Sequence, residues 1–205
     1  VYIAEIDQNL LVNGSGLKKL RDNNVCVKII KNKSSNYDNN IFFTLKNKKI
    51  PFITLKVASS ADGKIATSSY KSKWITSELS RLNGHLLRAK NDCILVGSNT
   101  IKKDNPRLNC RLEGLEKYSP DIFILDRSLK LNLSLKIFNT SKTKIFIFHS
   151  IEKICNPLKK KYLKKNILLH YVPETSKLID IKLAIKKIAD FGYQRILIEG
   201  GSSLA

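Results

Sequence analysis

The chain has 205 residues, of which 42% are hydrophobic and 26% are charged. This composition is typical of a globular protein and excludes a disordered chain, a collagen-like repeat and a small disulfide scaffold. The net charge of +20 suggests nucleic-acid binding, but only seven of the 37 basic residues are arginine, which phosphate and base readers favour. We therefore expect no nucleic-acid partner. No apolar stretch is long enough to predict a membrane span.

The first part of the chain predicts two strands, over residues 1–6 and 25–30, with a short helix over 17–23 between them. The first strand is expected to be buried. A turn is expected at 13–16, and the polar segment 31–40 predicts a loop or linker. A new pattern begins near Pro51, so we expect two domains, residues 1–47 and 48–205.

From residue 51 onward, strands alternate with helices. A helix is expected after a cap at Thr76 or Ser77, and an apolar stripe at helical spacing runs from Leu178 to Phe191 and stops at Gly192. Alternating strands and helices predict an α/β fold around a mostly parallel sheet. The expected strands are 52–59, 93–96, 122–125, 144–148, 167–172 and 195–198.

Cysteine and histidine spacing predicts no metal site. Cys26, Cys93, Cys110 and Cys155 form no CxxC pair, and the three histidines are isolated. Three of the cysteines lie in apolar runs, where buried free thiols favour a reducing, cytoplasmic location. The lysine-rich run 159–165 surrounds Leu158 and Tyr162 at helical spacing, which predicts a solvated helix face.

Two expected strand ends carry polar or glycine-rich turns, where ligands of open α/β sheets bind. Glu199-Gly200-Gly201-Ser202-Ser203 follows the last strand, and its glycines allow a phosphate to approach the backbone, although an ordinary strand-to-helix turn explains the same residues. After residue 97, the segment 98–111 brings Asp104, Arg107 and Arg111 near another strand end. That arrangement suits a phosphate or sugar as well as a solvated surface loop.

Lys56 lies inside a third expected strand, among apolar neighbours. An inward-facing ammonium there needs an acidic partner or a ligand, whereas an outward-facing one needs neither. Trp74, the only tryptophan, follows this strand. A single tryptophan is more typical of core packing than of a cofactor platform.

Several motifs occur together in the order of one known family: 56–66, 72–77, 87–89, 96–100, 104–108 and 199–201. From about Pro51 to its end, the chain resembles the reductase half of the bifunctional riboflavin-biosynthesis deaminase/reductase family. Residues 1–47 resemble the tail of the deaminase half. The resemblance implies a dihydrofolate-reductase-like fold, which we expect to be truncated at its C-terminus because the chain stops just after a glycine pair. The zinc-binding deaminase signature is absent, so zinc is expected only in a deaminase part that this chain lacks.

The activity that the resemblance implies is NADPH-dependent reduction of 5-amino-6-(5-phosphoribosylamino)uracil to its ribitylamino form. It implies substrate contacts for Ser72, Arg88, Leu108, Arg111 and Glu199. It implies NADPH contacts for Ala58, Trp74, Thr100, Asp104, Gly201, Ser202 and Ser203. Lys56 and Glu199 are the candidates for a charged catalytic pair, and Arg88 and Arg111 suit the substrate phosphate.

Three alternatives stay open from the sequence. They are a reductase of another pyrimidine or pterin, a non-catalytic basic binding module, and an incomplete half that only holds a partner subunit. A homodimer is also left open. The spacing does not separate NADPH from NADH, because it assigns no basic residue to the 2′-phosphate.

Overall fold

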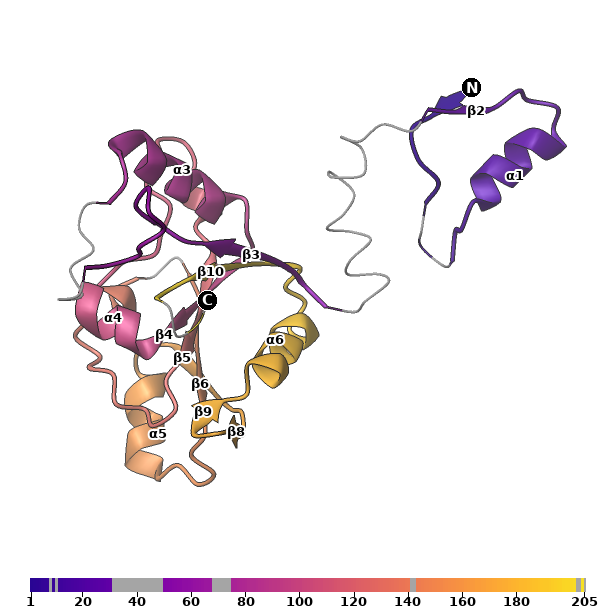
Figure 1. Ribbon diagram of the computed structural model, residues 1–205. Coiled ribbons are helices and arrows are strands. Elements are labelled where there is room, and N and C mark those ends of the chain that lie inside the picture. The colour runs from indigo at the N-terminus through magenta and orange to yellow at the C-terminus, as the bar shows by residue number, and fades with distance from the viewer. Residues whose placement is uncertain are drawn as a thin grey trace. The chain divides into compact units, whose positions relative to one another are not determined.

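The computed structural model describes residues 1–7, 9, 11–30, 50–67, 75–140, 143–201 and 204 (Figure 1). The chain divides into two compact units, Val1–Phe52 and Ile53–Ala205. The expected linker 31–40 lies outside the described residues. The assignment of residues 1–47 to a remnant of a deaminase-like domain stays a prediction.

The first unit contains two short parallel strands, β1 (Tyr2–Ile3) and β2 (Lys28–Ile29), and the helix α1 (Ser15–Asp22). Both strands are shorter than expected, and the prediction of a buried first strand is wrong because Val1 and Tyr2 are exposed. Ile3 of β1 is half-buried and lines, with Leu17 and Leu20 of α1, a groove of about 660 Å³ that contains none of the expected site residues.

The second unit is built on a six-stranded sheet with the strand order β3-β10-β4-β5-β6-β7. The pairings from β10 through to β7 are all parallel, which confirms the predicted α/β fold with a mostly parallel sheet. The strands are β3 (Phe52–Lys56), β4 (Cys93–Gly97), β5 (Asp121–Leu125), β6 (Ile145–His149), β7 (Ile167–Tyr171) and β10 (Arg195–Glu199).

Helices connect these strands and cover both faces of the sheet (Figure 1). Ser77 is the cap of the first helix, since its Oγ accepts the backbone N–H of Ser80 at 3.3 Å. The α-helices of this unit are α3 (Glu78–Ala89), α4 (Ser98–Asp104), α5 (Asn156–Leu163) and α6 (Ile181–Asp190), and the 3-10 helices are η1 (Glu116–Tyr118) and η2 (Lys136–Phe138).

The last helix begins later than the apolar stripe predicts. Leu178 lies in a small antiparallel hairpin, β8 (Glu174–Thr175) with β9 (Leu178–Ile179), and is exposed. Asp180 ends the hairpin and starts α6, because its carboxylate accepts the backbone N–H groups of Lys182 and Leu183. Gly192, with a φ of +90°, follows the helix as predicted.

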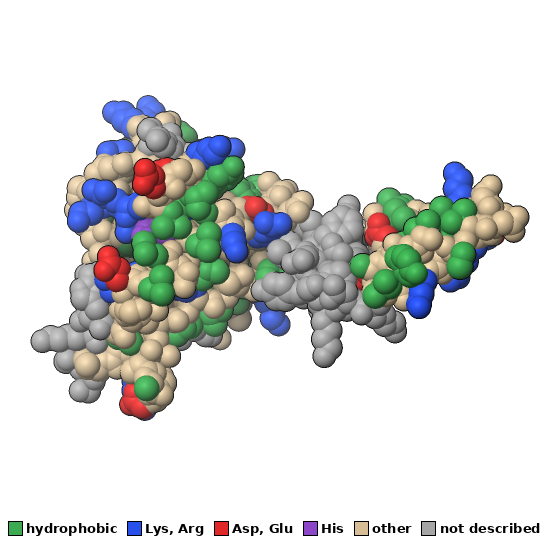
Figure 2. Space-filling view, turned by 90° about the horizontal axis from the view of Figure 1, so that it is seen from above, with side chains coloured by type: hydrophobic (Ala, Val, Ile, Leu, Met, Phe, Trp, Pro, Cys, Tyr) green, Lys and Arg blue, Asp and Glu red, His purple; other side chains and the backbone are tan. Residues whose placement is uncertain are grey.

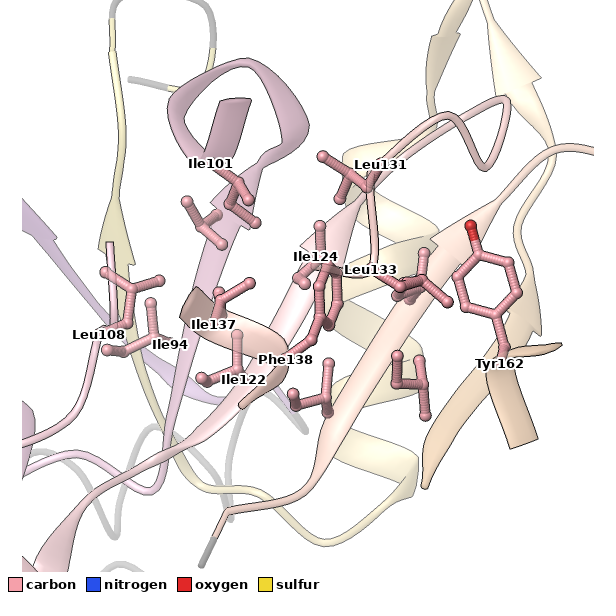
Figure 3. Close-up of a cluster of buried hydrophobic side chains, with 14 of the residues drawn as sticks. Ile94, Ile101, Leu108, Ile122, Ile124, Leu131, Leu133, Ile137, Phe138 and Tyr162 are labelled. Atoms are coloured by element: carbon pink, nitrogen blue, oxygen red, sulfur yellow. The ribbon is translucent and has the colours of Figure 1, made fainter. Parts of the chain in front are cut away.

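The core consists of two layers, one on each face of the sheet. Successive residues of a strand point to opposite faces, so Ile94 and Val96 of β4 join one cluster while Cys93 and Leu95 join the other. The first cluster packs against α4, α5 and η2, and Figure 3 shows its side chains. The second packs against α6. Burial on both faces explains the continuous apolar runs of these strands.

Tyr162 of α5 allows a direct test of this packing. Its side chain is 1% exposed, and its hydroxyl donates a hydrogen bond to the carbonyl of Leu129 at 3.0 Å. We expect Tyr162→Phe to lower the free energy of unfolding by about 1–2 kcal/mol, because a buried carbonyl loses its donor. Urea denaturation measures this change. The exposed Tyr171 supplies the control Tyr171→Phe, and equal effects of the two substitutions would contradict the prediction.

The basic residues lie mainly at the surface. On the face seen in Figure 2 they are distributed in several separate groups. The lysines at 159–161 of α5 are exposed, whereas Leu158 is half-buried and Tyr162 is buried, as the helical spacing predicts. Among the described residues, no helix is both long and apolar enough to cross a bilayer.

All four cysteines are free thiols. Cys93 and Cys110 are buried, but Cys26 and Cys155 are exposed, so two rather than three lie in the core. Cys155 directly precedes α5, where the chain runs along the surface, so the apolar residues near it in sequence do not bury it.

Candidate active site

Glu199 ends β10, and its side chain is only 8% exposed. Arg88 of α3 holds the carboxylate with two hydrogen bonds, from Nε to Oε1 at 2.7 Å and from Nη2 to Oε2 at 2.9 Å. Lys56 lies on the other side, with Nζ 3.5 Å from Oε2. The fold thus brings together one acidic and two basic side chains from three separate elements at the carboxyl end of the sheet.

Lys56 reaches Glu199 because β3 pairs with β10 in the sheet. Exposure alternates along β3, where Ile53 and Leu55 are exposed while Thr54 and Lys56 are half-buried. The sequence left open whether the Lys56 side chain faces inward or outward. It faces inward, and Glu199 is its acidic partner. Its side chain stays 35% exposed, so the ammonium is accessible to a ligand.

The ion pairs keep Glu199 ionised. Burial by itself raises the pKa of this carboxyl group, but the hydrogen bonds and charge of Arg88, together with the charge of Lys56, outweigh burial and hold the pKa below its usual value. Glu199 is therefore a carboxylate at neutral pH. It serves as a hydrogen-bond acceptor and a counter-charge and does not supply a proton.

Arg88 is largely committed within the protein. Besides its two bonds to Glu199, it donates from Nη1 to the backbone carbonyl of Asn109 at 3.2 Å. A guanidinium has five N–H donors, and described residues accept from three of those of Arg88. Arg88 thus links the end of β10 to the loop that follows α4.

That loop contains two non-glycine residues in the left-handed region, Asn105 with a φ of +43° and Leu108 with a φ of +56°. Such backbone costs about 1–3 kcal/mol and persists where neighbouring contacts enforce it. The side chain of Leu108 is 3% exposed and belongs to the core. Any contact of Leu108 with a substrate would therefore come from its main chain.

Arg111 lies at the end of this loop and is exposed. Its Nη1 donates to the Asn109 side-chain oxygen at 3.0 Å. Loss of hydration and the nearby charges of Arg88 and Arg107 lower the pKa of Arg111. These guanidiniums repel one another, and a bound phosphate would relieve that repulsion.

His85 of α3 is a residue of this cluster that the sequence did not point to. Its Nδ1 accepts the backbone N–H of Arg111 at 3.3 Å. The one available signal was its position three residues before Arg88, which places both side chains on the same face of the helix.

Of the described residues expected at the cofactor, Ala58 follows β3, Thr100 and Asp104 belong to α4, and Gly201 follows β10. Ala58 and Thr100 are half-buried, and Asp104 and Gly201 are exposed. A Cβ built on Gly200 would lie 3.9 Å from the Thr100 hydroxyl, so the turn after β10 passes close to α4. A Cβ at Gly97 or Gly201 would meet nothing within 4 Å.

Small side chains and the Thr100 hydroxyl, next to open space at Gly97 and Gly201, fit a dinucleotide at this edge, and the Asp104 carboxylate lies at the far end of α4. Four further residues expected at the site lie outside the described residues: Ser72, Trp74, Ser202 and Ser203.

Comparison with known proteins gives a consistent result. A family model described as the RibD C-terminal domain matches residues 51–205. The riboflavin biosynthesis protein RibD of Aquifex aeolicus is 36% identical over 203 residues, covering 98% of this chain and 54% of that protein. The RibD of Bacillus amyloliquefaciens is 34% identical over 205 residues, again covering 54% of its length. The chain thus spans about half the length of these curated relatives.

Solved structures show the same fold. The deaminase/5-amino-6-(5-phosphoribosylamino)uracil reductase of Thermotoga maritima superposes with a TM-score of 0.77 at 29% identity, over 100% of this chain and 54% of that one. A RibD structure from Acinetobacter baumannii gives a TM-score of 0.77 at 26% identity, over 100% of this chain and 55% of that one. These similarities and the parallel sheet establish the dihydrofolate-reductase-like fold.

Proposed function

The chain belongs to the RibD C-terminal domain family, and on this basis we propose that it reduces 5-amino-6-(5-phosphoribosylamino)uracil with NADPH. The product is 5-amino-6-(5-phosphoribitylamino)uracil, an intermediate of riboflavin biosynthesis. The observation that carries the proposal is the buried Glu199 carboxylate, held by Arg88 and Lys56 at the carboxyl end of the sheet.

When bound, NADPH supplies a hydride to the sugar carbon C1. Ala58, Thr100, Asp104 and the Gly200–Gly201 turn would hold the dinucleotide. Trp74, Ser202 and Ser203 stay predicted contacts of the dinucleotide, and Ser72 stays a predicted contact of the substrate. The protein has to keep C1 within reach of the hydride and to stabilise the oxygen that separates from C1 as the ribose ring opens.

Lys56 is suited to that oxygen. Its ammonium is partly exposed and lies 3.5 Å from the Glu199 carboxylate, which keeps it in place. We assign it the donation of a hydrogen bond, and then a proton, to the sugar oxygen during ring opening. Glu199 orients Lys56 and accepts hydrogen bonds from the substrate, and Arg88 orients Glu199.

Arg111 is assigned to the phosphate of the substrate. It is exposed, its guanidinium donates to the protein through Nη1 alone in the described part of the chain, and it adjoins Arg88 and Arg107. We expect Arg111→Ala to raise KM for the phosphorylated substrate by about 10- to 100-fold, the value of one or two charge-assisted hydrogen bonds. KM for the dephosphorylated analogue should change by less than about twofold. Arg127→Ala, which alters an exposed ion pair with Glu174, is the control, and equal effects of Arg111→Ala on both substrates would refute the assignment.

Substrate competition tests the activity itself. Oxidation of NADPH is followed at 340 nm with the phosphoribosylaminouracil and, separately, with dihydrofolate. Both assays are repeated with NADH in place of NADPH. Turnover with the aminouracil and not with dihydrofolate supports the proposal. Turnover with dihydrofolate alone would favour a pterin reductase, and turnover with neither by folded protein would favour a binding module.

We also infer a cytoplasmic location, which the four free thiols support, two of them buried. A homodimer stays a prediction.

A further inference from the structure

Three side chains hold the backbone of residues 109–111, a segment that has no strand or helix of its own. Arg88 donates to the carbonyl of Asn109, the N–H of Cys110 donates to the hydroxyl of Ser119 at 3.1 Å, and the N–H of Arg111 donates to Nδ1 of His85 at 3.3 Å. Two of these three side chains come from one face of α3. The position of Arg111 therefore depends directly on that helix.

Only a neutral His85 can make this contact. Because Nδ1 accepts the N–H of Arg111, the ring carries its single proton on Nε2. A proton on Nδ1 would face another donor and break the bond.

The surroundings of His85 favour the neutral ring. Burial and the charges of Arg88, on the same helix, and Arg111, on the adjoining loop, lower the pKa of His85, while the Asn109 carbonyl and Glu199 at the end of β10 oppose that shift to a smaller extent. The 3-10 helix η1 also packs against α3, and its Glu116 and Lys117 are exposed and opposite in charge. Because the lowering effects outweigh the opposing ones, the His85 ring is neutral at neutral pH and its Nδ1 stays a hydrogen-bond acceptor.

We propose that His85 is a positioning residue of the phosphate subsite, which acts by holding the backbone of Arg111 so that its guanidinium faces the phosphate of the substrate. This inference rests on the proposed function, because it takes the phosphate assignment of Arg111 as its premise. Without His85, the end of a loop that already contains left-handed residues at Asn105 and Leu108 would lose a fixed point.

Two substitutions at this position separate a positioning role from simple packing. His85→Leu keeps the approximate size but removes the acceptor. His85→Asn places a carbonyl oxygen near the position of Nδ1 and cannot be protonated. His170→Asn, at a half-buried histidine of β7, is the matched control.

The probe is ribose 5-phosphate, with its dissociation constant measured by calorimetry at pH 7.5. We expect His85→Leu to weaken binding by about 10-fold, the value of one hydrogen bond, and His85→Asn to bind within about threefold of wild type. In turnover, KM for the phosphorylated substrate should follow the same order while kcat changes by less than twofold. Unchanged binding and KM in His85→Leu, or a failure of His85→Asn to restore them, would overturn the proposal.

The pH dependence of the dissociation constant adds a second measurement, which a purely packing role of His85 would not change. The pKa of His85 lies below its ordinary value, so the pH is lowered stepwise through the acid range until the ring takes up its proton. From that point the wild type should lose more affinity than His85→Asn. The phosphate itself titrates near pH 6, and the comparison between the two proteins removes that contribution. Wild-type affinity that rises relative to that of His85→Asn as the pH falls would show that His85 acts as a charged ligand and would overturn the proposal.

The two proposals can fail separately. If the wild type binds ribose 5-phosphate with the expected dependence on His85 but does not oxidise NADPH, the reductase proposal fails and the positioning role holds. If the wild type turns over and neither KM nor binding depends on His85, only the positioning role fails.

Discussion

Glu199→Gln is expected to impair both stability and turnover, because the carboxylate neutralises Arg88 and orients Lys56. The Arg88 side chain is 14% exposed, so its charge would lose its partner in a poorly hydrated place. Removing one member of a buried ion pair costs about 3–5 kcal/mol. We expect the free energy of unfolding to fall by about 3 kcal/mol and kcat to fall by about 100-fold. Urea denaturation and NADPH oxidation measure the two effects.

The matched control is the exposed ion pair between Arg127 and Glu174. Its atoms lie 3.0 Å apart, but the two side chains are 49% and 45% exposed. Glu174→Gln should therefore change stability by less than about 1 kcal/mol and leave kcat unchanged. A stability loss in Glu199→Gln no larger than in this control would contradict the buried-pair argument. Glu199→Asp keeps the charge and tests the distance requirement if the glutamine variant does not fold.

The same ion pair predicts a dependence of stability on pH. The pKa of Glu199 is lower in the folded protein than its ordinary value, so the folded state binds the proton less readily than the unfolded state. The resulting stabilisation is complete above the unfolded pKa of about 4.3 and is lost as the pH falls through the lower folded pKa. Glu199→Gln should lack this part of the acid sensitivity.

Lys56→Met should have the second large effect, and one confined to turnover. Lys56 is 35% exposed and its ion pair with Glu199 is long, at 3.5 Å, so the free energy of unfolding should change by less than about 1 kcal/mol. Loss of the proton donor should lower kcat by about 100-fold. Steady-state kinetics with saturating NADPH, together with urea denaturation, separate the two quantities.

Lys186→Met is the control for the loss of a lysine, because Lys186 is exposed on α6. It should leave kcat and KM unchanged. Turnover of Lys56→Met near the wild-type value would remove Lys56 from the mechanism, whereas a large loss of stability would show that its role is structural.

Most of the sheet could be predicted because buried parallel strands leave a strong local signal. The strands that contain Cys93–Gly97 and Ile145–His149 are continuous apolar runs, and both are buried as expected. The apolar stripe of α6 was also visible, but it does not show where the helix starts. Asp180 caps the helix and so sets its first residue at Ile181, and Leu178 lies in the preceding hairpin instead.

The first unit shows where the sequence signal fails. Residues 1–6 are apolar enough to predict a buried strand, yet only Tyr2–Ile3 forms one, and Tyr2 is 71% exposed. Burial depends on a second layer, and in the described part of this unit α1 shares a groove with Ile3 but leaves Tyr2 exposed. An apolar run therefore indicates side chains that burial would stabilise, but it does not predict which other element packs on them.

The candidate site was only partly predictable for a similar reason. Lys56 was identified by its charge in an apolar strand, which is a local signal. Arg88 and Glu199, which form the bidentate contact, are 111 positions apart in the sequence. The residues around either one give no signal that predicts their pairing. His85 contributes through one hydrogen bond to a backbone N–H, a role that does not depend on any motif.

Transfer of deuterium from the cofactor to the sugar tests the central claim most directly. The protein is supplied with NADPH deuterated at the transferable position of the nicotinamide and with the phosphoribosylaminouracil, and the product is examined by mass spectrometry and NMR. Our account predicts one deuterium per product molecule, bound to C1 of the ribityl chain, and about 100-fold less labelled product from Lys56→Met and Glu199→Gln at equal reaction times. NADPH oxidation without deuterium at C1, or no product from folded protein, would contradict it.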